Sequence, residues 1–88
     1  MELAARLGRL AHHCRNGRLC SGYPGFPDTV IVGACGLLLA ELKMPGRGLE
    51  SDQITWKYTL LAVGIAYYIW QPIDLASGLV ECHIRAST

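Results

Sequence analysis

Residues 24–43, PGFPDTVIVGACGLLLAELK, are the stretch that decides the fold of this 88-residue chain. Two β-strands are predicted within it, at Thr29–Val32 and Leu37–Leu42, because β-branched and leucine residues fill both segments. Gly33 and Gly36 bracket the turn between them. The stretch therefore predicts an antiparallel β-hairpin.

Three polar side chains stand out in this apolar hairpin. If the turn is centred on residues 34 and 35, the numbers of paired residues add up to 69, so Asp28 lies opposite Glu41. Lys43 shares their face because strand side chains alternate. Opposed carboxylates repel each other unless a cation lies between them, and hard cations such as Mg²⁺ prefer carboxylate ligands. The alternative is that the three groups form an ordinary solvated face, since Glu-x-Lys is common on strands. A three-residue turn would also shift the register by one and move Asp28 away from Glu41.

The spacing of several motifs resembles one known family. Pro27-Asp28, twelve residues and then Glu41-Leu42-Lys43 resemble the PD-(D/E)xK nuclease pattern, and the wider series resembles its VRR-NUC branch. That series comprises Gly25–Asp28, Glu41–Lys43, Leu49, Gln53, Trp56, Gly64, Tyr68, Trp70 and Pro72. It covers about residues 15–75 in order.

The resemblance implies a minimal restriction-endonuclease-like α/β fold over residues 1–88, as a single domain. Its expected order is helix, β-hairpin, helix, strand and a short C-terminal element. The implied activity is Mg²⁺- or Mn²⁺-dependent hydrolysis of DNA phosphodiester bonds, on branched or junction DNA, in stand-alone phage and bacterial proteins. The implied metal ligands are Asp28, Glu41 and the Leu42 carbonyl; Asp28, Glu41, Lys43 and Gln53 are the implied catalytic residues. The implied DNA contacts are Arg18, Arg15 and Lys57.

One feature departs from the family. The family's first helix begins further upstream and carries a glutamate that helps to hold the metal, whereas Glu2 lies too close to Asp28 in sequence to match it. The first helix is therefore expected to be shortened. The alternative function is a catalytically inactive DNA-binding or assembly module that keeps the nuclease fold.

The composition indicates which partners the protein can have. Hydrophobic residues make up 51% of the chain, a high share for a small domain. This favours a homodimer whose interface buries the surplus, and the tract Tyr58–Trp70 is the expected patch. Residues 1–27 carry a net charge of +3 and residues 28–52 carry −2, an arrangement that suits phosphates approaching a metal and equally suits an ordinary domain, since four arginines in 27 residues do not make a basic tail. No apolar tract reaches the ~20 residues needed to span a bilayer, so we expect no membrane partner and a cytoplasmic location. The resemblance implies that the cell is bacterial or phage-infected.

The remaining elements follow from local patterns. A first helix is expected from Glu2 to about Cys14, because Leu3, Leu7 and Leu10 recur at helical spacing. Five further expectations are a loop over Arg15–Pro27, a helix over Glu50–Val63 capped by Ser51 and ended by Gly64, a strand over Ile65–Trp70, a short strand or helix over Leu79–Ile84, and a frayed end at Arg85–Thr88.

The four cysteines show no Cys-x-x-Cys pair. Without a signal peptide, reduced and mostly buried cysteines are expected rather than a disulfide framework. A zinc site formed by His12, His13, Cys14 and Cys20 is the alternative, although its spacing fits no familiar pattern.

Overall fold

The computed structural model describes residues 2–14 and 24–88, and it contains the predicted hairpin. Strand β2 (Thr29–Val32) and strand β3 (Leu37–Leu42) have the predicted boundaries. Their antiparallel register pairs Thr29 with Ala40 and Val32 with Leu37, so every pair of numbers adds up to 69. The sequence prediction of the register is confirmed.

The hairpin turn needs glycine for a packing reason. The N–H of Gly33 donates to the Gly36 carbonyl over 2.9 Å and closes the turn. A Cβ atom on Gly33 would lie 2.2 Å from the backbone oxygen of Thr88. The turn is therefore pressed against the last residue of the chain, and only a residue without a side chain fits there.

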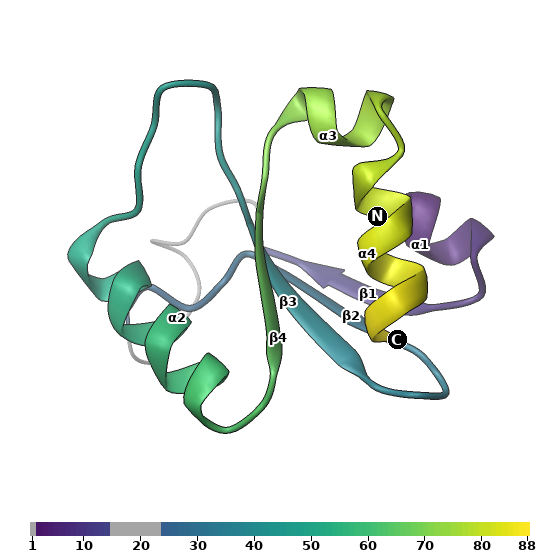
Figure 1. Cartoon of the computed structure of the whole chain (residues 1–88), viewed down its shortest axis with the longest axis horizontal. Coiled ribbons are helices and arrows are strands. Elements are labelled where there is room, and N and C mark those ends of the chain that lie inside the picture. The colour runs from purple at the N-terminus through teal and green to yellow at the C-terminus, as the bar shows by residue number, and fades with distance from the viewer. Residues whose placement is uncertain (1, 15–23) are drawn as a thin grey trace.

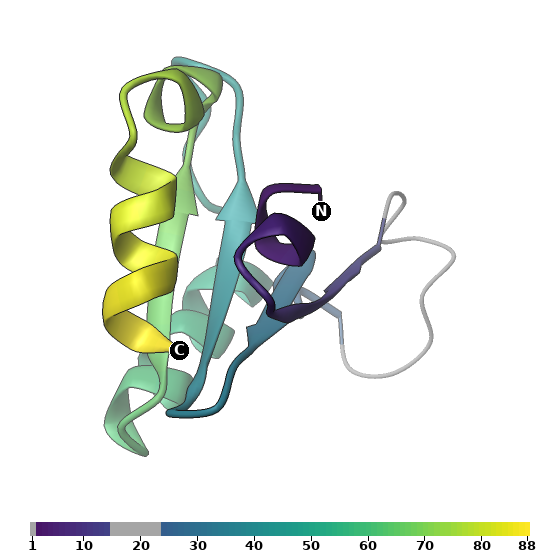
Figure 2. The same cartoon turned by 90° about the vertical axis from the view of Figure 1, so that its right-hand side faces the viewer.

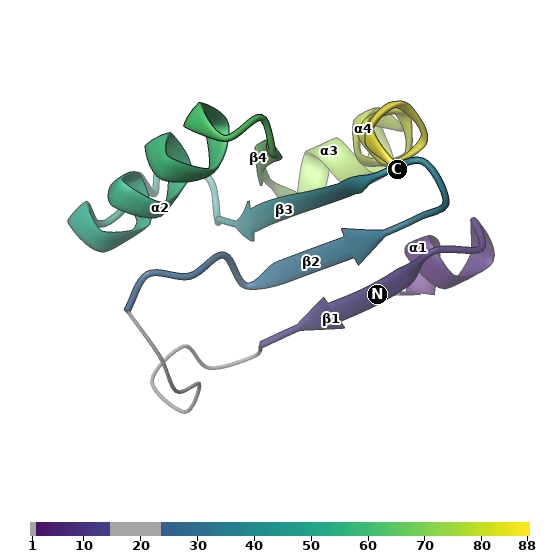
Figure 3. The same cartoon turned by 90° about the horizontal axis from the view of Figure 1, so that it is seen from below.

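Two further strands complete a four-stranded mixed sheet in the order β1-β2-β3-β4. Strand β1 (Leu10–His13) pairs antiparallel with β2, and β4 (Ala66–Trp70) pairs parallel with β3. Figure 3 shows β1 at one edge of the sheet. The predicted third strand is thus confirmed to within one residue at its start.

The predicted helix from Glu2 to Cys14 is wrong in its second half. Helix α1 ends at Arg6 (Glu2–Arg6), and Gly8 adopts a positive φ of 76°. The N–H groups of Gly8 and Arg9 donate to the carbonyls of Ala5 and Ala4, the bond pattern of a Schellman C-terminus. Gly8 therefore stops the helix, and the chain after it joins the sheet.

Helix α2 (Ser51–Ala62) follows the hairpin, and it ends as predicted at Gly64, which has a φ of 84°. Its N-cap is Glu50, whereas Ser51 was predicted. The Glu50 N–H donates to Oε1 of Gln53 over 2.8 Å, so a capping box begins the helix one residue earlier than the serine suggested.

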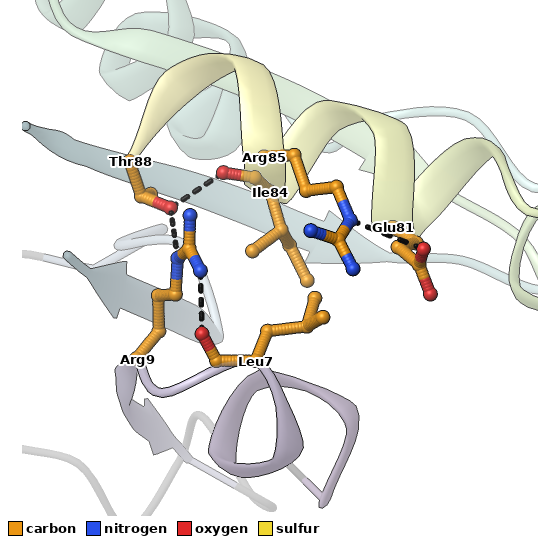
Figure 4. Close-up of polar contacts among 6 residues, drawn as sticks. All are labelled: Leu7, Arg9, Glu81, Ile84, Arg85 and Thr88. Atoms are coloured by element: carbon orange, nitrogen blue, oxygen red, sulfur yellow. Dashed lines mark hydrogen bonds and ion pairs between the residues drawn. The ribbon is translucent and has the colours of Figure 1, made fainter.

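The C-terminal segment is helical and ordered. Helix α3 (Pro72–Ala76) is followed by helix α4 (Leu79–Ser87). Of the two predictions for Leu79–Ile84, a strand or a helix, the helix is correct. The predicted fraying of Arg85–Thr88 is wrong, because Thr88 is only 4% exposed. Its hydroxyl accepts a hydrogen bond from Nε of Arg9 over 3.1 Å and donates to the Ile84 carbonyl (Figure 4).

The sheet has two differently covered faces. Helices α1, α3 and α4 lie on one face and α2 lies on the other (Figures 1 and 2). The core fills the first face, between the sheet, α1 and α4. Its buried residues are Ala4, Ile31, Leu38, Ala40, Trp70, Val80 and Ile84. The chain is therefore a compact α/β domain with a four-stranded mixed sheet and four helices among its described residues.

The cysteine prediction needs correction. Cys14 is disulfide-bonded, and Cys35 and Cys82 are free but exposed rather than buried. Within residues 2–14 and 24–88, no helix is long and apolar enough to cross a membrane.

Candidate metal-binding site on the α2 face of the sheet

Asp28 and Glu41 lie opposite each other at one end of the hairpin, as the register requires. Asp28 directly precedes β2 and lies between its neighbouring strands. Its carbonyl accepts the N–H of Cys14 over 2.8 Å, and both of its carboxylate oxygens lie 3.3 Å from the backbone N of Leu42. The Thr29 hydroxyl donates to Oδ1 over 3.0 Å. The Asp28 carboxylate is therefore held in place by the two hairpin strands.

Glu41 is a buried carboxyl with one free oxygen. Its side chain is on the α2 face, and the residue is only 6% exposed. Nε2 of Gln53 donates to Oε1 over 3.1 Å, whereas Oε2 is buried without a hydrogen-bond partner among the described residues. A buried acceptor left unpaired costs free energy, so this oxygen marks a place where a ligand would be stabilised.

Electrostatics at Glu41 favour a cation. Burial, most of all, and the neighbouring Asp28 carboxyl together raise the pKa of Glu41 to about 7, a net value that already includes the opposing effects of the Lys43 ammonium and of a hydrogen bond from the Asp28 backbone. Two ionised carboxylates this close repel each other, and the Lys43 ammonium offsets only part of that repulsion. A divalent cation bound to both would lower this pKa, because an opposite charge favours the ionised form.

Gln53 links helix α2 to strand β3. Its side chain accepts the Glu50 N–H through Oε1 and donates to Glu41 through Nε2. The same amide thus caps the helix and fixes one oxygen of the carboxyl. The structure brings Gln53 to the carboxylate pair, where the family resemblance implied it would lie, and its catalytic role stays a prediction.

The segment before Asp28 holds α2 in this position. The indole Nε1 of Trp56 donates to the Pro24 carbonyl over 3.0 Å, and the Phe26 ring lies 4.9 Å from the Trp56 ring in a T-shaped contact. Gly25 has a φ of 89°, and a Cβ atom there would lie 2.5 Å from the backbone of Asp52. Close approach of the loop to the first turn of α2 therefore requires this glycine.

Lys43 follows the last residue of β3 and is half-buried. Its backbone N–H donates to the Trp70 carbonyl over 2.8 Å, which continues the pairing of β3 with β4. Its ammonium attracts the Glu41 charge. The ligand role predicted for the Leu42 carbonyl, between these two residues, stays a prediction.

A cavity of about 490 Å³ lies beside Lys43. Its lining residues are His13, Thr29, Leu42, Lys43, Met44, Trp70, Gln71, Pro72, Leu75 and Val80. Thr29, Leu42 and Trp70 belong to the core face, so this mostly apolar hollow lies on the other side of the sheet from the two carboxylates.

Of the three residues predicted to contact DNA, the structure describes only Lys57. Arg15 and Arg18 lie outside the described residues. Lys57 follows Gln53 by one turn of α2 and lies with Nζ 5.5 Å from the centre of the Tyr58 ring. Its predicted contact with DNA stays a prediction.

Tyr67 belongs to this face and was missed as a site residue. It pairs with Leu39 in the parallel register, which puts its side chain on the same face as Glu41. It is 8% exposed, and its hydroxyl has no partner among the described residues. Burial raises the pKa of Tyr67 to about 12, with smaller contributions from the Glu41 and Asp28 charges. The alternation of Ile65–Trp70 predicted its strand, but no local pattern gives the register of a parallel pair.

The ligand set fits a hard cation better than zinc. In the part of the chain that the structure describes, no three His, Cys, Asp or Glu side chains gather into a metal-binding group. His12 and His13 lie on the exposed edge strand, and Cys14 is disulfide-bonded. One or two carboxylates with water are a usual ligand set for Mg²⁺, whereas structural zinc needs four protein ligands. The unpaired Oε2 of Glu41 beside Asp28 matches the first pattern.

No protein-family model matches this chain, and neither the curated proteins nor the solved structures include a match. The case for its function therefore rests on the residues and the geometry described above.

Proposed function

We propose that this protein is a Mg²⁺- or Mn²⁺-dependent DNA endonuclease that hydrolyses phosphodiester bonds in branched or junction DNA, with a restriction-endonuclease-like fold of the VRR-NUC type. The observation that carries the proposal is the pairing of Asp28 with Glu41, in which one buried Glu41 oxygen has no partner among the described residues. The sheet order, with an antiparallel hairpin followed by a helix and a parallel strand, supports the fold.

The cation would be held by Asp28, Glu41 and the Leu42 carbonyl. A bound divalent cation supplies two things: it lowers the pKa of a coordinated water and it neutralises charge that grows on the phosphate. Lys43 then positions the attacking water and contacts the phosphate with its ammonium. Gln53 keeps the Glu41 carboxylate in one orientation through its bond to Oε1. Water attacks phosphorus directly while the bond from phosphorus to one sugar oxygen breaks, and that oxygen leaves as a hydroxyl after taking a proton from solvent, so no covalent enzyme intermediate forms.

Substrate binding would use the basic residues around this site. A guanidinium matches a phosphate with two parallel hydrogen bonds, which suits Arg18 and Arg15 for neighbouring phosphates. Lys57 would contact the DNA backbone from α2. Contacts with phosphates form on DNA of any base sequence, so they suit an enzyme that recognises the shape of the DNA rather than its bases.

We also propose that the protein acts as a homodimer in the cytoplasm of a bacterial or phage-infected cell. The outer stripe of α2 supports the dimer, because Ile54, Tyr58 and Leu61 are 41%, 63% and 45% exposed. Two copies that pack these stripes together would bury apolar surface and present two active sites, which suits the cutting of two strands.

The test is cleavage of labelled duplex, flap and four-way-junction DNA with Mg²⁺ or Mn²⁺. Lys43→Ala and Asp28→Asn are expected to abolish cutting. Arg85→Ala is the control, since it also removes one positive charge but lies in an exposed ion pair with Glu81 on α4. Metal-dependent cutting by wild type and control alone supports the proposal.

The second candidate is a catalytically inactive DNA-binding or assembly module with the same fold. It is favoured by the small number of acidic ligands, because only two carboxylates meet at the described site. DNA binding without cutting by any variant, at any metal concentration tested, would establish this alternative and overturn the nuclease proposal.

A further inference from the structure

Two buried polar atoms on the α2 face lack partners, and they belong to neighbouring residues of the sheet. They are Oε2 of Glu41 and the hydroxyl of Tyr67, the side-chain atoms that are buried and unpaired among the described residues. One is an acceptor when ionised and the other is a donor. Unpaired buried groups of complementary kind indicate an interaction that forms in another state of the site.

The register places these groups within reach of each other. Glu41 pairs with Ile69, two residues after Tyr67, so Tyr67 is a diagonal neighbour on the same face. Neighbouring strands lie about 4.8 Å apart and each residue advances about 3.3 Å along a parallel strand, so this diagonal is about 8 Å, a span that an aromatic side chain crosses. A tyrosine hydroxyl is protonated at neutral pH, so towards an ionised carboxylate it acts as a donor.

The adjacent residues of β4 show that burial alone does not leave such atoms unpaired. The Tyr68 hydroxyl, on the opposite face, is hydrogen-bonded to Oγ of Ser87 at 2.9 Å. The Trp70 Nε1–H donates to Nδ1 of His83 over 2.9 Å. The strand therefore satisfies its polar side chains on the core face and leaves Tyr67 unpaired only beside the carboxylates.

We propose that Tyr67 is a positioning residue of the metal site, whose hydroxyl donates a hydrogen bond to the Glu41 carboxylate when that carboxylate holds a divalent cation. This inference rests on the proposed function, because it needs the cation. Gln53 then fixes one carboxylate oxygen and Tyr67 fixes the other. Hydrogen bonds from outside the ligand set orient ligating carboxylates, and their loss typically costs about 10- to 100-fold in metal affinity.

The experiment is calorimetric titration of the whole chain with Mn²⁺ and with Mg²⁺. Tyr67→Phe is expected to weaken binding about tenfold. Tyr68→Phe is the matched control: it removes the same hydroxyl from the next residue and is expected to leave metal affinity unchanged. Glu41→Gln is expected to abolish binding and shows that the titrated site is this one.

Thermal melting without metal separates positioning from a structural role. Tyr67→Phe removes an unpaired buried hydroxyl, so its melting temperature is expected to equal or exceed that of wild type. Tyr68→Phe breaks a formed hydrogen bond and is expected to melt earlier. Added Mn²⁺ is expected to raise the melting temperature of wild type and Tyr68→Phe more than that of Tyr67→Phe.

The near-ultraviolet difference spectrum gives an independent signature, since a tyrosine whose hydroxyl gains a hydrogen bond changes its absorbance. Mn²⁺ is expected to produce this change in wild type and in Tyr68→Phe but not in Tyr67→Phe. Wild-type affinity and spectrum in Tyr67→Phe would overturn the role of Tyr67 and leave the proposed function standing. No cation binding by wild type, or binding that Glu41→Gln does not affect, would overturn both.

Discussion

Two adjacent tyrosines on β4 show how differently the faces of the sheet are built. Tyr68 points into the core face, where its hydroxyl is bonded to Ser87 and its ring stacks on His83 with centroids 3.9 Å apart. Tyr67 points to the α2 face, where its hydroxyl is buried and unpaired within the described chain. Each unpaired buried polar group costs about 1–3 kcal/mol, so a fold keeps one where another requirement outweighs stability. The comparison shows that the core face stabilises the domain, and it supports our proposal that the α2 face carries the chemistry.

The covering helices differ in the same way. Helix α4 buries Val80 and Ile84 in the core. Helix α2 has no fully buried residue and is attached through Gln53 and Trp56. Most of the stability of a helix comes from its buried face, so α2 contributes less to folding than α4 does.

The largest expected effect tests the core face directly. Ile31→Ala removes a fully buried side chain and is expected to lower the free energy of unfolding by about 3 kcal/mol through the cavity it leaves. Val32→Ala, on the next residue and 40% exposed, is expected to change it by less than about 0.5 kcal/mol. Urea unfolding measures both. Equal losses would contradict the assignment of the core to one face.

The second prediction concerns pH and the α2 face. Glu41 has a pKa of about 7 in the folded protein and 4.5 as its ordinary value, so the folded state holds the proton more tightly. The resulting stability is fully present below pH 4.5 and is lost as the pH rises through 7. After allowance for screening by solvent, we expect a loss of about 2 kcal/mol between pH 5 and pH 8.

Glu41→Gln is expected to remove this part of the pH dependence, because the amide does not titrate. Unfolding of both chains in urea at pH 5 and pH 8 gives the difference, in which the other titrating groups cancel. Addition of Mg²⁺ at pH 8 is expected to restore stability to wild type and not to the glutamine variant. Parallel pH profiles for the two proteins would contradict the buried position of this carboxyl.

The third prediction concerns a satisfied polar group on the core face. His83→Leu leaves the Trp70 Nε1–H without its acceptor, in a residue that is 2% exposed. We expect a loss of about 1.5 kcal/mol in urea unfolding. His12→Leu is the control, since His12 is exposed on the edge strand, and its change is expected to stay within about 0.5 kcal/mol. A neutral His83→Leu would show that the core face tolerates an unpaired donor as the α2 face does.

The sequence predicted the hairpin and its register because both depend on local features. Gly33 and Gly36 fix the turn, and the alternation of strand residues then places Asp28 opposite Glu41. The end of α2 was predictable for the same reason, since Gly64 supplies a positive φ that few other residues adopt.

The errors come from competition between local signals and from contacts between distant residues. The leucine spacing at Leu3, Leu7 and Leu10 suggested one long helix and concealed the stop at Gly8. The order at Thr88 depends on Arg9 and Gly33, which lie far away in sequence. The position of Tyr67 beside Glu41 depends on a parallel register, which tertiary packing sets.

The smallest expected effect on folding tests the proposed dimer. Ile54→Ser combined with Leu61→Ser changes two exposed residues on the outer stripe of α2, so the stability of the monomer is expected to change by less than about 0.5 kcal/mol per residue. Self-association is a different quantity, because a stripe buried between two copies loses apolar contact when serine replaces it. Sedimentation equilibrium is expected to show a dimer for wild type and a monomer for the double variant. If wild type is a monomer at all concentrations, the dimer proposal is wrong. Only the inner face of α2 then has a role, because it holds Gln53 against Glu41.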